Sequence, residues 1–423
     1  MTVLWVVVLL GGIVATIGRA SLLDLKMRSS RVDSIRCKWA CKGGIEKAVA
    51  VLNEDLTDSD SFHDYWHANA VDFNDIILEG CVLTVKVVDE AGKLNINTAT
   101  FDQVMQLEGM TEEIANSILD WRDGDDEPKI GGAEGGYYES LHFGYRIRNG
   151  RFRTIRELLL VKGVTEDLLY GEDANLNGVL DYNEKDKDQS WPIDNGDERL
   201  DLGWIAYLTC YSYDRNISGD GTSRININNA NQQQLERDLG LSSSHAKWIV
   251  ENKPNNGYES IADLIDKKSP AKPSSQSGSD SDSDKAEKLD ISTYQDIVDY
   301  ITVEDSGRIM GRVNINTAGK EVLKALFAGS DIAEQLADSI VNYRDSQLAG
   351  MLSIGELLDA DGLSVDDFKK IADDITVRSE VYTVMATAVG NSNRLGRGLV
   401  IEGVIDRSRT PYRVYYWYQG VSN

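Results

Sequence analysis

The chain has 423 residues, of which 41% are hydrophobic, so it is long and apolar enough for two or three folded domains. Its formal net charge is -25. This charge argues against a protein that binds nucleic acid through phosphates, because such binding depends on Lys and Arg. The four cysteines form no CxxC pair and indicate neither a thiolate metal site nor a disulfide framework.

An uncharged apolar segment opens the chain. Residues 1–18 carry no charged side chain, and the run Val3–Leu10 is entirely apolar. A membrane-spanning helix needs about 20 apolar residues and tolerates about 17. A cleaved secretory signal is the alternative, but the segment lacks a basic n-region and a small-residue cleavage site. We therefore predict a transmembrane helix over residues 1–18.

The same helix is predicted to continue over residues 19–56 as an amphipathic segment. No proline occurs between Leu22 and Leu56, and apolar residues recur there at helical spacing. In the stretch 19–47, eight basic residues outnumber three acids. By the positive-inside rule this bias would place the segment in the cytoplasm. An exported domain therefore requires a basic leader upstream of Met1.

The next predicted element is a β-strand from Cys81 to Val88, indicated by β-branched residues and partial alternation. It leads directly into a six-residue sequence motif that occurs three times and is called the repeated phrase below. The copies are Leu94–Ala99, Ile225–Ala230 and Val313–Ala318. Such self-similarity indicates a repeated supersecondary unit.

More than the phrase recurs. The first and third copies are followed by apolar-periodic runs that end in an aromatic residue, Arg and Asp, at Trp121–Asp123 and Tyr343–Asp345. Short strand-like runs precede the second and third copies, at 206–210 and 299–303. We predict that each module consists of a strand, a turn and a helical hairpin. The three modules are predicted at about 95–171, 225–266 and 313–375.

A second signal lies later in each module, a Ser or Thr followed three residues on by an acid. The three pairs are Thr154 with Glu157, Ser260 with Asp263, and Ser353 with Glu356. This spacing is typical of a capping box, in which side chains satisfy orphan donors at the start of a helix. We expect a helix to begin at each.

The modules resemble helix-hairpin-helix units, which often hold DNA through turn amides and nearby basic residues. Here the turn Leu107–Thr111 is followed by Glu112 and Glu113, which would repel phosphate. A fold can be kept without its function. DNA binding therefore stays as an alternative.

The sharpest chemical signal is the stretch Asp173–Glu184. It places oxygen-bearing side chains at positions 1, 3, 5, 9 and 12 of a calcium loop and glycine at position 6. The predicted calcium ligands are Asp173, Asn175, Asn177, Val179, Asp181 and Glu184. No helix is predicted after the loop, which favours a structural ion over a calcium switch. The alternative is an acidic solvated turn.

Further acids are less specific. A second metal site or a plain acidic loop would both account for Asp186, Asp188, Asp194 and Asp197. The cluster at 120–127 with the later Glu134 lacks metal-ligand spacing and is predicted to be a solvated turn. The four histidines form no zinc motif, and we find no nucleophile elbow, P-loop or dinucleotide fingerprint. We therefore do not expect an enzyme.

The rest of the chain completes a fold prediction of class α+β. A mobile linker is expected over 268–288, which is rich in Ser and Asp and has no large apolar residue. Three final strands are predicted at 381–389, 398–406 and 412–418. Isolated strands are not stable, so we expect these to share an antiparallel sheet with the earlier strand, under the N-terminal helix. The β domain would comprise 57–94 and 376–423, and the helical domain 95–375 would be an insertion.

This combination resembles the K-type minor pseudopilins of type II secretion systems. The resemblance spans nearly the whole chain and is most specific at Asn149–Val161 and Leu169–Asp173. It implies a single-pass inner-membrane protein whose periplasmic part has a pilin-like fold, with a large helical insertion that binds calcium. Two departures are the absence of a visible leader ending in glycine and the presence of Trp5 where major pilins have glutamate, which fits a subunit at the tip.

The resemblance also implies partners. The chain would be matured by a prepilin peptidase and would join the I- and J-type minor pseudopilins at the pseudopilus tip, supporting export of folded proteins across the outer membrane. Other pseudopilus and inner-membrane secretion components and membrane lipid are further expected partners, and nucleic acid is not. Two alternatives are a membrane-anchored helix-hairpin-helix protein of DNA uptake and a minor pilin of a type IV pilus. Pairing of Cys81 with Cys210 stays open.

Overall fold

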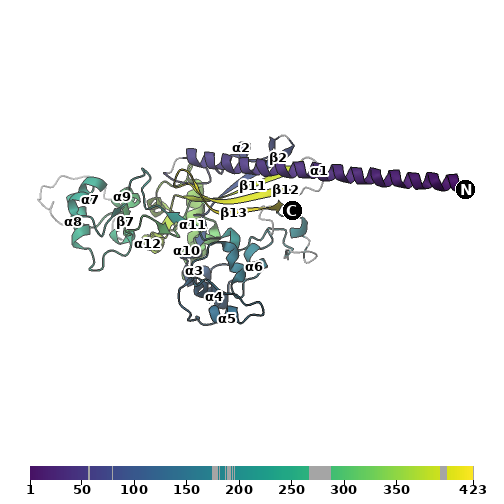
Figure 1. Cartoon of the computed structure of the whole chain (residues 1–423). Helices are drawn as coiled ribbons and strands as arrows, with labels where there is room; N and C mark the ends of the chain where they lie inside the picture. The colour runs from purple at the N-terminus through teal and green to yellow at the C-terminus, as the bar shows by residue number, and fades with distance from the viewer. Residues whose placement is uncertain are drawn as a thin grey trace.

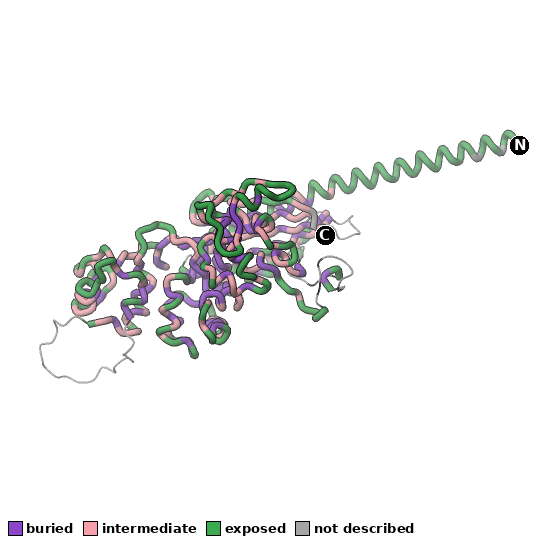
Figure 2. Tube along the Cα trace, turned by 90° about the horizontal axis from the view of Figure 1, so that it is seen from below, coloured by how far each residue is buried: buried purple, intermediate pink, exposed green. Residues whose placement is uncertain are grey.

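One long helix, α1 (Thr2–Glu54), begins the chain in the computed structural model, which describes all residues except 56–57, 79, 174–179, 181, 186, 188–191, 193, 195, 266–286, 391–397 and 423. No described side chain before Cys37 is buried, and this part of α1 projects away from the body (Figures 1 and 2). From Cys37 onward one face is buried. Its members recur every three or four residues, as helix geometry requires: Cys37, Cys41, Ile45, Ala48 and Leu52.

The body of the fold contains a five-stranded antiparallel sheet. Its strands are β1 (Ile76–Leu78), β2 (Cys81–Asp89), β11 (Val381–Gly390), β12 (Gly398–Asp406) and β13 (Arg413–Ser422), in the order β1-β2-β11-β12-β13. The strands β2 and β11 are neighbours, and Val87 pairs with Val384 although most of the chain lies between them. The predicted long helix and antiparallel sheet are confirmed.

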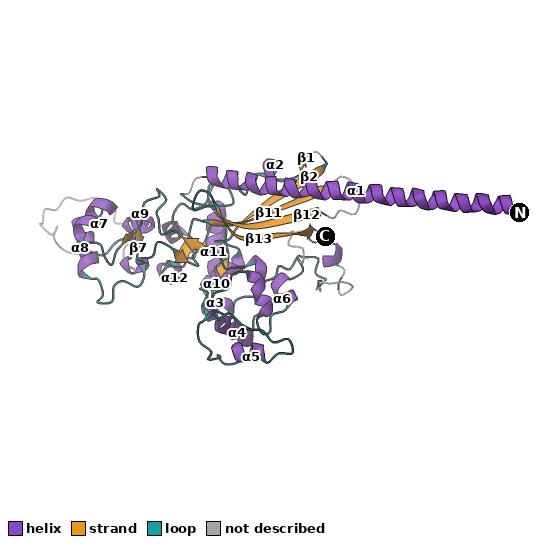
Figure 3. Cartoon of the chain, viewed as in Figure 1, coloured by secondary structure: helices purple, strands orange, loops and turns teal. Residues whose placement is uncertain are grey.

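The C-terminal part of α1 covers one face of this sheet (Figure 3). Alternate residues of β2 and β11 point into the shared core, including Leu83, Val85 and Ala386. Gly44 allows the helix to lie close to the strands, because a Cβ at this position would lie 2.9 Å from Cγ2 of Val85.

The opposite face of the sheet carries contacts with the insertion. Arg156 of the insertion pairs with Glu402 of β12 at 3.0 Å and donates to the hydroxyl of Tyr416 at 2.9 Å. Its guanidinium also lies over the Tyr416 ring. The sheet is therefore a middle layer between α1 and the inserted segment.

The insertion consists of short helices and two-residue strands. Its α-helices are α3 (Phe101–Val104), α4 (Glu112–Arg122), α5 (Gly135–Glu139), α6 (Glu166–Tyr170), α7 (Gln232–Leu239), α8 (Ser243–Glu251), α9 (Ile291–Ile297), α10 (Lys320–Leu326), α11 (Ala333–Ser346) and α12 (Val365–Ile371), and α2 (Ala70–Phe73) precedes the sheet. Its 3-10 helices are η1 (Ile155–Leu160), η2 (Tyr182–Glu184), η4 (Trp204–Ala206), η5 (Ile261–Leu264), η6 (Val298–Tyr300) and η7 (Ile354–Asp359). A continuous hydrophobic core runs through all of the repeated units, from Leu94 to Val377.

Each repeated phrase begins with a strand that pairs, in parallel, with a later strand of the same unit. The pairs are β3 (Leu94–Asn95) with β4 (Leu208–Thr209), β6 (Ile225–Asn226) with β7 (Ile301–Thr302), and β9 (Val313–Asn314) with β10 (Ile375–Thr376). The strand-like runs predicted to open the second and third modules therefore close the first and second. The predicted order of strand, turn and hairpin is wrong in this respect. A separate antiparallel pair, β5 (Tyr213–Asp214) with β8 (Ile309–Met310), spans the second unit.

The capping signals were only partly predictive. Ser260 and Ser353 form capping boxes with Asp263 and Glu356. Thr154 makes no capping hydrogen bond, and Glu157 accepts from the Arg153 amide at 3.2 Å instead. All three sites begin 3-10 helices rather than α-helices.

Candidate functional site

The predicted calcium loop is only partly within the described residues. Asp173 and Glu184 are described, and both are buried. Asn175, Asn177, Val179 and Asp181 lie outside the described residues. The predicted set of calcium ligands therefore stays a prediction.

The base of this loop is closed by the backbone. Gly171, which ends α6, forms an antiparallel bridge with Leu202, and the Glu172 amide donates to the Asp201 carbonyl at 2.9 Å. The Asp201 amide in turn donates to a carboxylate oxygen of Glu172 at 2.9 Å. A Cβ at Gly171, where φ is +63°, would lie 2.4 Å from the Asp201 carbonyl oxygen, so glycine is needed there. The two ends of the segment 172–201, which contains the predicted calcium loop, are thus held side by side.

The second predicted metal group is also only partly within the described residues. Asp186 and Asp188 lie outside the described residues. Asp194 accepts from the amides of Lys187 at 3.1 Å and Gly196 at 2.6 Å, and Asp197 accepts from the Arg199 amide at 2.7 Å. These two side chains organise turns in the part of the loop that the structure describes, and a metal role for this group remains a prediction.

The first Asn of each repeated phrase orders the phrase itself. Its carboxamide oxygen accepts from the amide two residues later, at 3.0 Å in the first unit, 2.8 Å in the second and 3.0 Å in the third. Its NH2 group reaches the segment just after the closing strand. Asn95 donates to the Ser212 carbonyl, Asn226 to the Val303 carbonyl, and Asn314 to the hydroxyl of Ser379.

The second Asn of the phrase binds the capping segment of its unit. Asn97 receives the Phe152 amide at 2.7 Å and donates to the Phe152 carbonyl at 3.0 Å. Asn228 makes the same two bonds with Tyr258, and Asn316 makes them with Met351. The repeated phrase is therefore bonded, in each unit, to the residue two positions before the recurring Ser or Thr.

The recurring aromatic-Arg-Asp runs serve the same phrase. Arg122 donates to the carbonyls of Ile96 and Ala99, and Arg344 donates to those of Ile315 and Ala318. In the second unit Lys253 fills this role with a bond to the Asn228 carbonyl at 2.8 Å. These basic groups bind backbone inside the fold, which leaves them poorly placed to bind nucleic acid phosphates.

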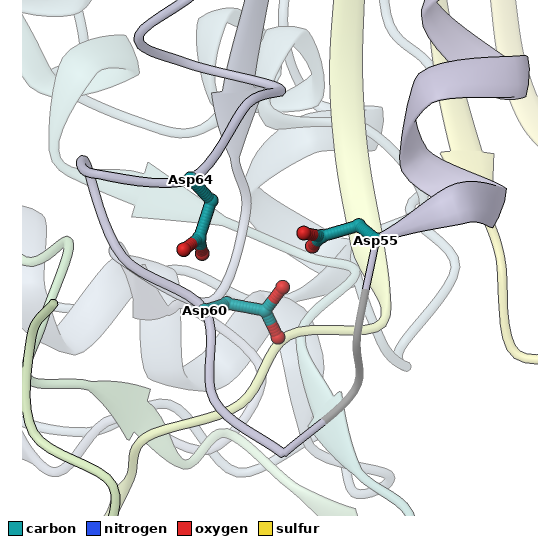
Figure 4. A group of neighbouring side chains, drawn as sticks. All are labelled: Asp55, Asp60 and Asp64. Atoms are coloured by element: carbon teal, nitrogen blue, oxygen red, sulfur yellow. The ribbon is translucent and has the colours of Figure 1, made fainter.

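A largely buried junction joins the end of α1, the sheet and the third unit. Figure 4 shows its three aspartates, Asp55, Asp60 and Asp64. Carboxylate oxygens of Asp55, Asp60 and Asp64 lie within 4.8 Å of one another. Arg407 supplies the positive charge, at 3.1 Å from Asp55 and 2.5 Å from Asp60. The Tyr382 hydroxyl donates to Asp60 at 2.6 Å. Since a guanidinium already lies between the acids, this group is an ion-pair network rather than a metal site.

A second buried carboxylate extends the junction. Asp89 at the end of β2 accepts from Asn314 at 3.0 Å, from Thr317 at 2.5 Å and from Ser379 at 2.6 Å. Asn314 also donates to the Asp60 carbonyl at 3.0 Å. The third repeated phrase is thereby fixed to the β domain. Sequence reasoning missed this junction because its members are isolated residues with no spacing signal.

The junction makes stability depend on pH. Burial raises the pKa of Asp55 and of Asp89 to about 6. It also raises the pKa of Glu380, whose carbonyl accepts from the Arg407 amide at 2.9 Å, to about 7. A carboxyl group whose pKa is higher in the folded than in the unfolded state binds its proton more tightly when folded, so stability grows as pH falls from about 7 towards about 5. We expect the full chain, in detergent with a chelator, to melt at a higher temperature at pH 5.5 than at pH 7.5. Glu380→Gln should reduce this difference, and a melting temperature that falls over the same interval would contradict the assignment.

The cysteines lie in two separate cores. Cys81 packs with Cys37 and Cys41 between α1 and the sheet, whereas Cys210 lies in the core of the insertion. All four are free thiols. The open question of a Cys81–Cys210 disulfide is thus answered in the negative.

The projecting part of α1 is the remaining candidate site. Among the described residues it is the one helix long and apolar enough to cross a membrane, and its apolar window is not buried against the protein. Exposed side chains such as Trp5, Leu9 and Ile13 are unusual for a surface in contact with water. This helix is a candidate single membrane span.

Comparison with known proteins decides the family. Two family models, both described as Type II secretion system (T2SS), protein K, match the chain, one over residues 84–170 and the other over 313–378. The chain belongs to the protein K family of type II secretion. The two matches cover the strand β2 with most of the first unit, and then the third unit up to its junction with the sheet.

As a protein K, the chain is a minor pseudopilin of type II secretion, and the family is a structural component rather than a known enzyme family. The chain is also similar to a chain of the crystal structure of the GspK-GspI-GspJ complex from the type 2 secretion system of enterotoxigenic Escherichia coli. The two are 14% identical, with a TM-score of 0.49, over 92% of this chain and 98% of the other. No curated protein matches the chain. The K-type resemblance stated from the sequence is confirmed.

Proposed function

We propose that this protein K assembles at the tip of the pseudopilus with I- and J-type minor pseudopilins, and so supports export of folded proteins across the outer membrane. The observation that carries the proposal is the match of two protein K models to two separate units of one insertion. The long helix packed on an antiparallel sheet is compatible with a pilin-like scaffold.

The two halves of α1 support an inner-membrane location with the bulk of the chain in the periplasm. The exposed apolar part would be stored in the bilayer and would later pack against the equivalent helices of sister subunits. The part after Cys37 is fixed to the sheet. A subunit built in this way can leave the membrane without refolding its body.

The repeated units support an assembly role more than DNA binding. We propose that they are helix-hairpin-helix-like units that have kept the fold and lost the function. Arg122 and Arg344 are bound to carbonyls of the repeated phrase, and the turn before α4 is followed by acids. These acids would repel phosphate, and the net charge of -25 opposes nucleic-acid binding in the same way.

Partner binding tests the proposed function directly. We expect the full chain in detergent to co-elute from a size-exclusion column with I- and J-type pseudopilins of the same system at micromolar concentration. The major pseudopilin of the same system, added alone, should not replace them. Separate elution of all three proteins would contradict the tip assignment.

We further propose that the stretch Asp173–Glu184 binds one structural calcium ion. All of its predicted side-chain ligands offer oxygen, the donor that calcium prefers, and Glu184 at its end is fully buried. The closed base at Gly171 and Leu202 would let the ion rigidify one loop without moving its neighbours.

Removal of this ion is expected to lower thermal stability. The double variant Asp173→Ala, Glu184→Ala should melt a few degrees below the parent in calcium, because a ligand bound only to the folded state stabilises it. In chelator the difference should shrink. A melting temperature that does not respond to calcium or to the double substitution would contradict the proposal.

A further inference from the structure

The face of the sheet that points away from α1 encloses a cavity that the proposed function does not use. Side chains of β2 and β11 alternate between the two faces, so Val88 and Thr383 point towards the insertion. Figure 3 shows α6 and α1 on opposite sides of the sheet. Between the sheet and the insertion lies a cavity of about 300 Å³, at the small end of the range for ligand pockets.

Both walls of this cavity are mainly apolar. Tyr170, the last residue of α6, and Ala206, the last residue of η4, line the side of the insertion. Further apolar side chains come from both layers: Val88, Met385 and Val404 from the sheet, and Ile155, Ile205 and Leu208 from the insertion. Such walls favour an apolar ligand over water. A molecule held there contacts the sheet and the insertion at once.

Most of the charged groups at the cavity already have partners. Arg156 pairs with Glu402 at 3.0 Å, and Lys93 pairs with Glu90 at 2.8 Å. Asp173, the third acid at the cavity, belongs to the stretch proposed to bind calcium. These five groups are therefore not available to hold a further charged molecule.

The remaining cation at the cavity is Lys86. Lys86 lies opposite Met385, and Met385 lies opposite Glu402, so Lys86 is two strands, or about 10 Å, away from the Arg156–Glu402 pair. Lys86 is exposed, and it makes no ion pair or hydrogen bond with any residue that the structure describes. It is thus an unpaired ammonium at the mouth of an apolar cavity.

Two tyrosine hydroxyls at the cavity can also donate hydrogen bonds. The hydroxyl of Tyr416 accepts from Arg156 at 2.9 Å, which leaves its own proton free to donate. The hydroxyl of Tyr170 has no hydrogen-bond partner within the described parts of the chain. Together with Lys86 these groups favour a ligand whose polar end is an acceptor with negative charge.

We propose that the cavity binds a small amphipathic anion, a short alkyl chain that ends in a carboxylate or a phosphate. The chain lies between Val88 and Ile155, and the head meets Lys86 at the mouth. A free fatty acid and a single-chain phospholipid share this chemistry. The proposal goes beyond the proposed function, because it involves none of the partner pseudopilins. Since the ligand contacts both layers, it strengthens the attachment of the insertion to the sheet.

Equilibrium dialysis of radiolabelled octanoate tests the proposal. The full chain is kept in a steroidal detergent, which is too bulky and rigid to enter the cavity, and the opposite chamber holds empty micelles at the same concentration. Partition of octanoate into micelles then cancels. We expect a saturable excess of octanoate on the side of the protein, and a smaller excess of octanol, which has the same chain without the charge.

Two pairs of variants locate the ligand. Val88→Phe fills the cavity and should abolish binding, and Val82→Phe is its matched control, because Val82 lies on the same face of β2 outside the cavity. Lys86→Met should weaken octanoate binding about tenfold, because it removes a charge-assisted hydrogen bond, and should leave octanol binding unchanged. Lys86→Arg should keep the preference for octanoate.

An equal distribution of octanoate between the chambers would overturn the proposal. A folded Val88→Phe that binds octanoate as the parent does would also overturn it, and Met385→Phe on the neighbouring strand serves if Val88→Phe does not fold. Equal binding by the parent and Lys86→Met would overturn the assignment of the head.

Octyl phosphate separates the two sources of the ligand. Tighter binding of octyl phosphate than of octanoate supports a phospholipid, and the reverse order supports a fatty acid. Failure of both to bind would contradict the proposal. Far-UV circular dichroism establishes which variants are folded.

Discussion

Replacement of Arg407 by methionine is expected to lower the free energy of unfolding by about 3–5 kcal/mol, because removal of one partner leaves a buried charge uncompensated. The Arg407 side chain is 4% exposed and Asp60 is 1% exposed. Besides its two ion pairs, Arg407 donates to the carbonyl of Leu52 near the end of α1 at 3.1 Å. Its loss would therefore loosen the helix end as well as the acid group.

Urea unfolding of the full chain in detergent measures this effect, with tryptophan fluorescence as the signal. Trp66 is a suitable reporter, since its ring packs against Tyr382 at 5.2 Å within the same network. Arg409→Met is the matched control, because it removes the same charge from an exposed position two residues away. A destabilisation of both variants to the same small extent would show that the network is not needed. The loss in Arg407→Met should shrink at low pH, where a protonated Asp60 needs no counter-ion.

The repeated phrase allows a comparison within one molecule. Asn314→Ala is expected to cost about 2–3 kcal/mol, because it removes one of the donors to the buried Asp89 and leaves the Asn316 amide without its acceptor. The equivalent Asn226→Ala should cost about 1 kcal/mol or less, since Asn226 is half-buried and its Asp305 partner can turn to water. The same substitution at the same place in the motif thus has two predicted outcomes.

The same urea titration serves for this pair, and the difference between the variants is the quantity of interest. Equal losses would mean that the phrase acts only within its own unit. A larger loss in Asn314→Ala would show that the third unit carries the connection between the insertion and the β domain.

Much of the scaffold was predictable because its signals are local or repetitive. Spacing along α1 and alternation along β2 and β11 follow from one well-buried face each. The repeated phrase was found as a pattern, and its cause is now clear. The side chains of its two Asn residues accept hydrogen bonds from backbone amides that a two-residue strand leaves without a backbone acceptor.

The closing strands were harder to assign. Each of β4, β7 and β10 has only two residues, and the sequence cannot say whether such a run pairs forwards or backwards. Their parallel partners lie many residues away in the chain. Because β4 and β7 lie shortly before the next repeated phrase in the sequence, they were assigned to the following unit. In the structure they pair with the strand of the preceding phrase instead.

The acids Asp120 and Glu134 were predicted to lie in a solvated turn, but both are buried. Asp120 and Glu134 are close because a glycine turn folds back over the end of α4, and neither residue shows this in its local sequence. The ion pairs of Arg407 are equally distant, since Asp60 and Arg407 come from opposite ends of the chain. Ion pairs between residues far apart in the chain produce no periodic pattern in the sequence, so they could not be predicted from it.

The parallel strand pairs have a consequence for how such a chain can change over time. Each pair brings the first and last strands of a unit together, so the chain between them can lengthen or shorten without displacing the neighbouring units. The stretch Asp173–Glu184 lies between β3 and β4, and the Ser- and Asp-rich stretch 268–288 lies between β6 and β7. Repeated units of common origin can in this way carry different inserted segments while the helix and sheet of the scaffold stay the same.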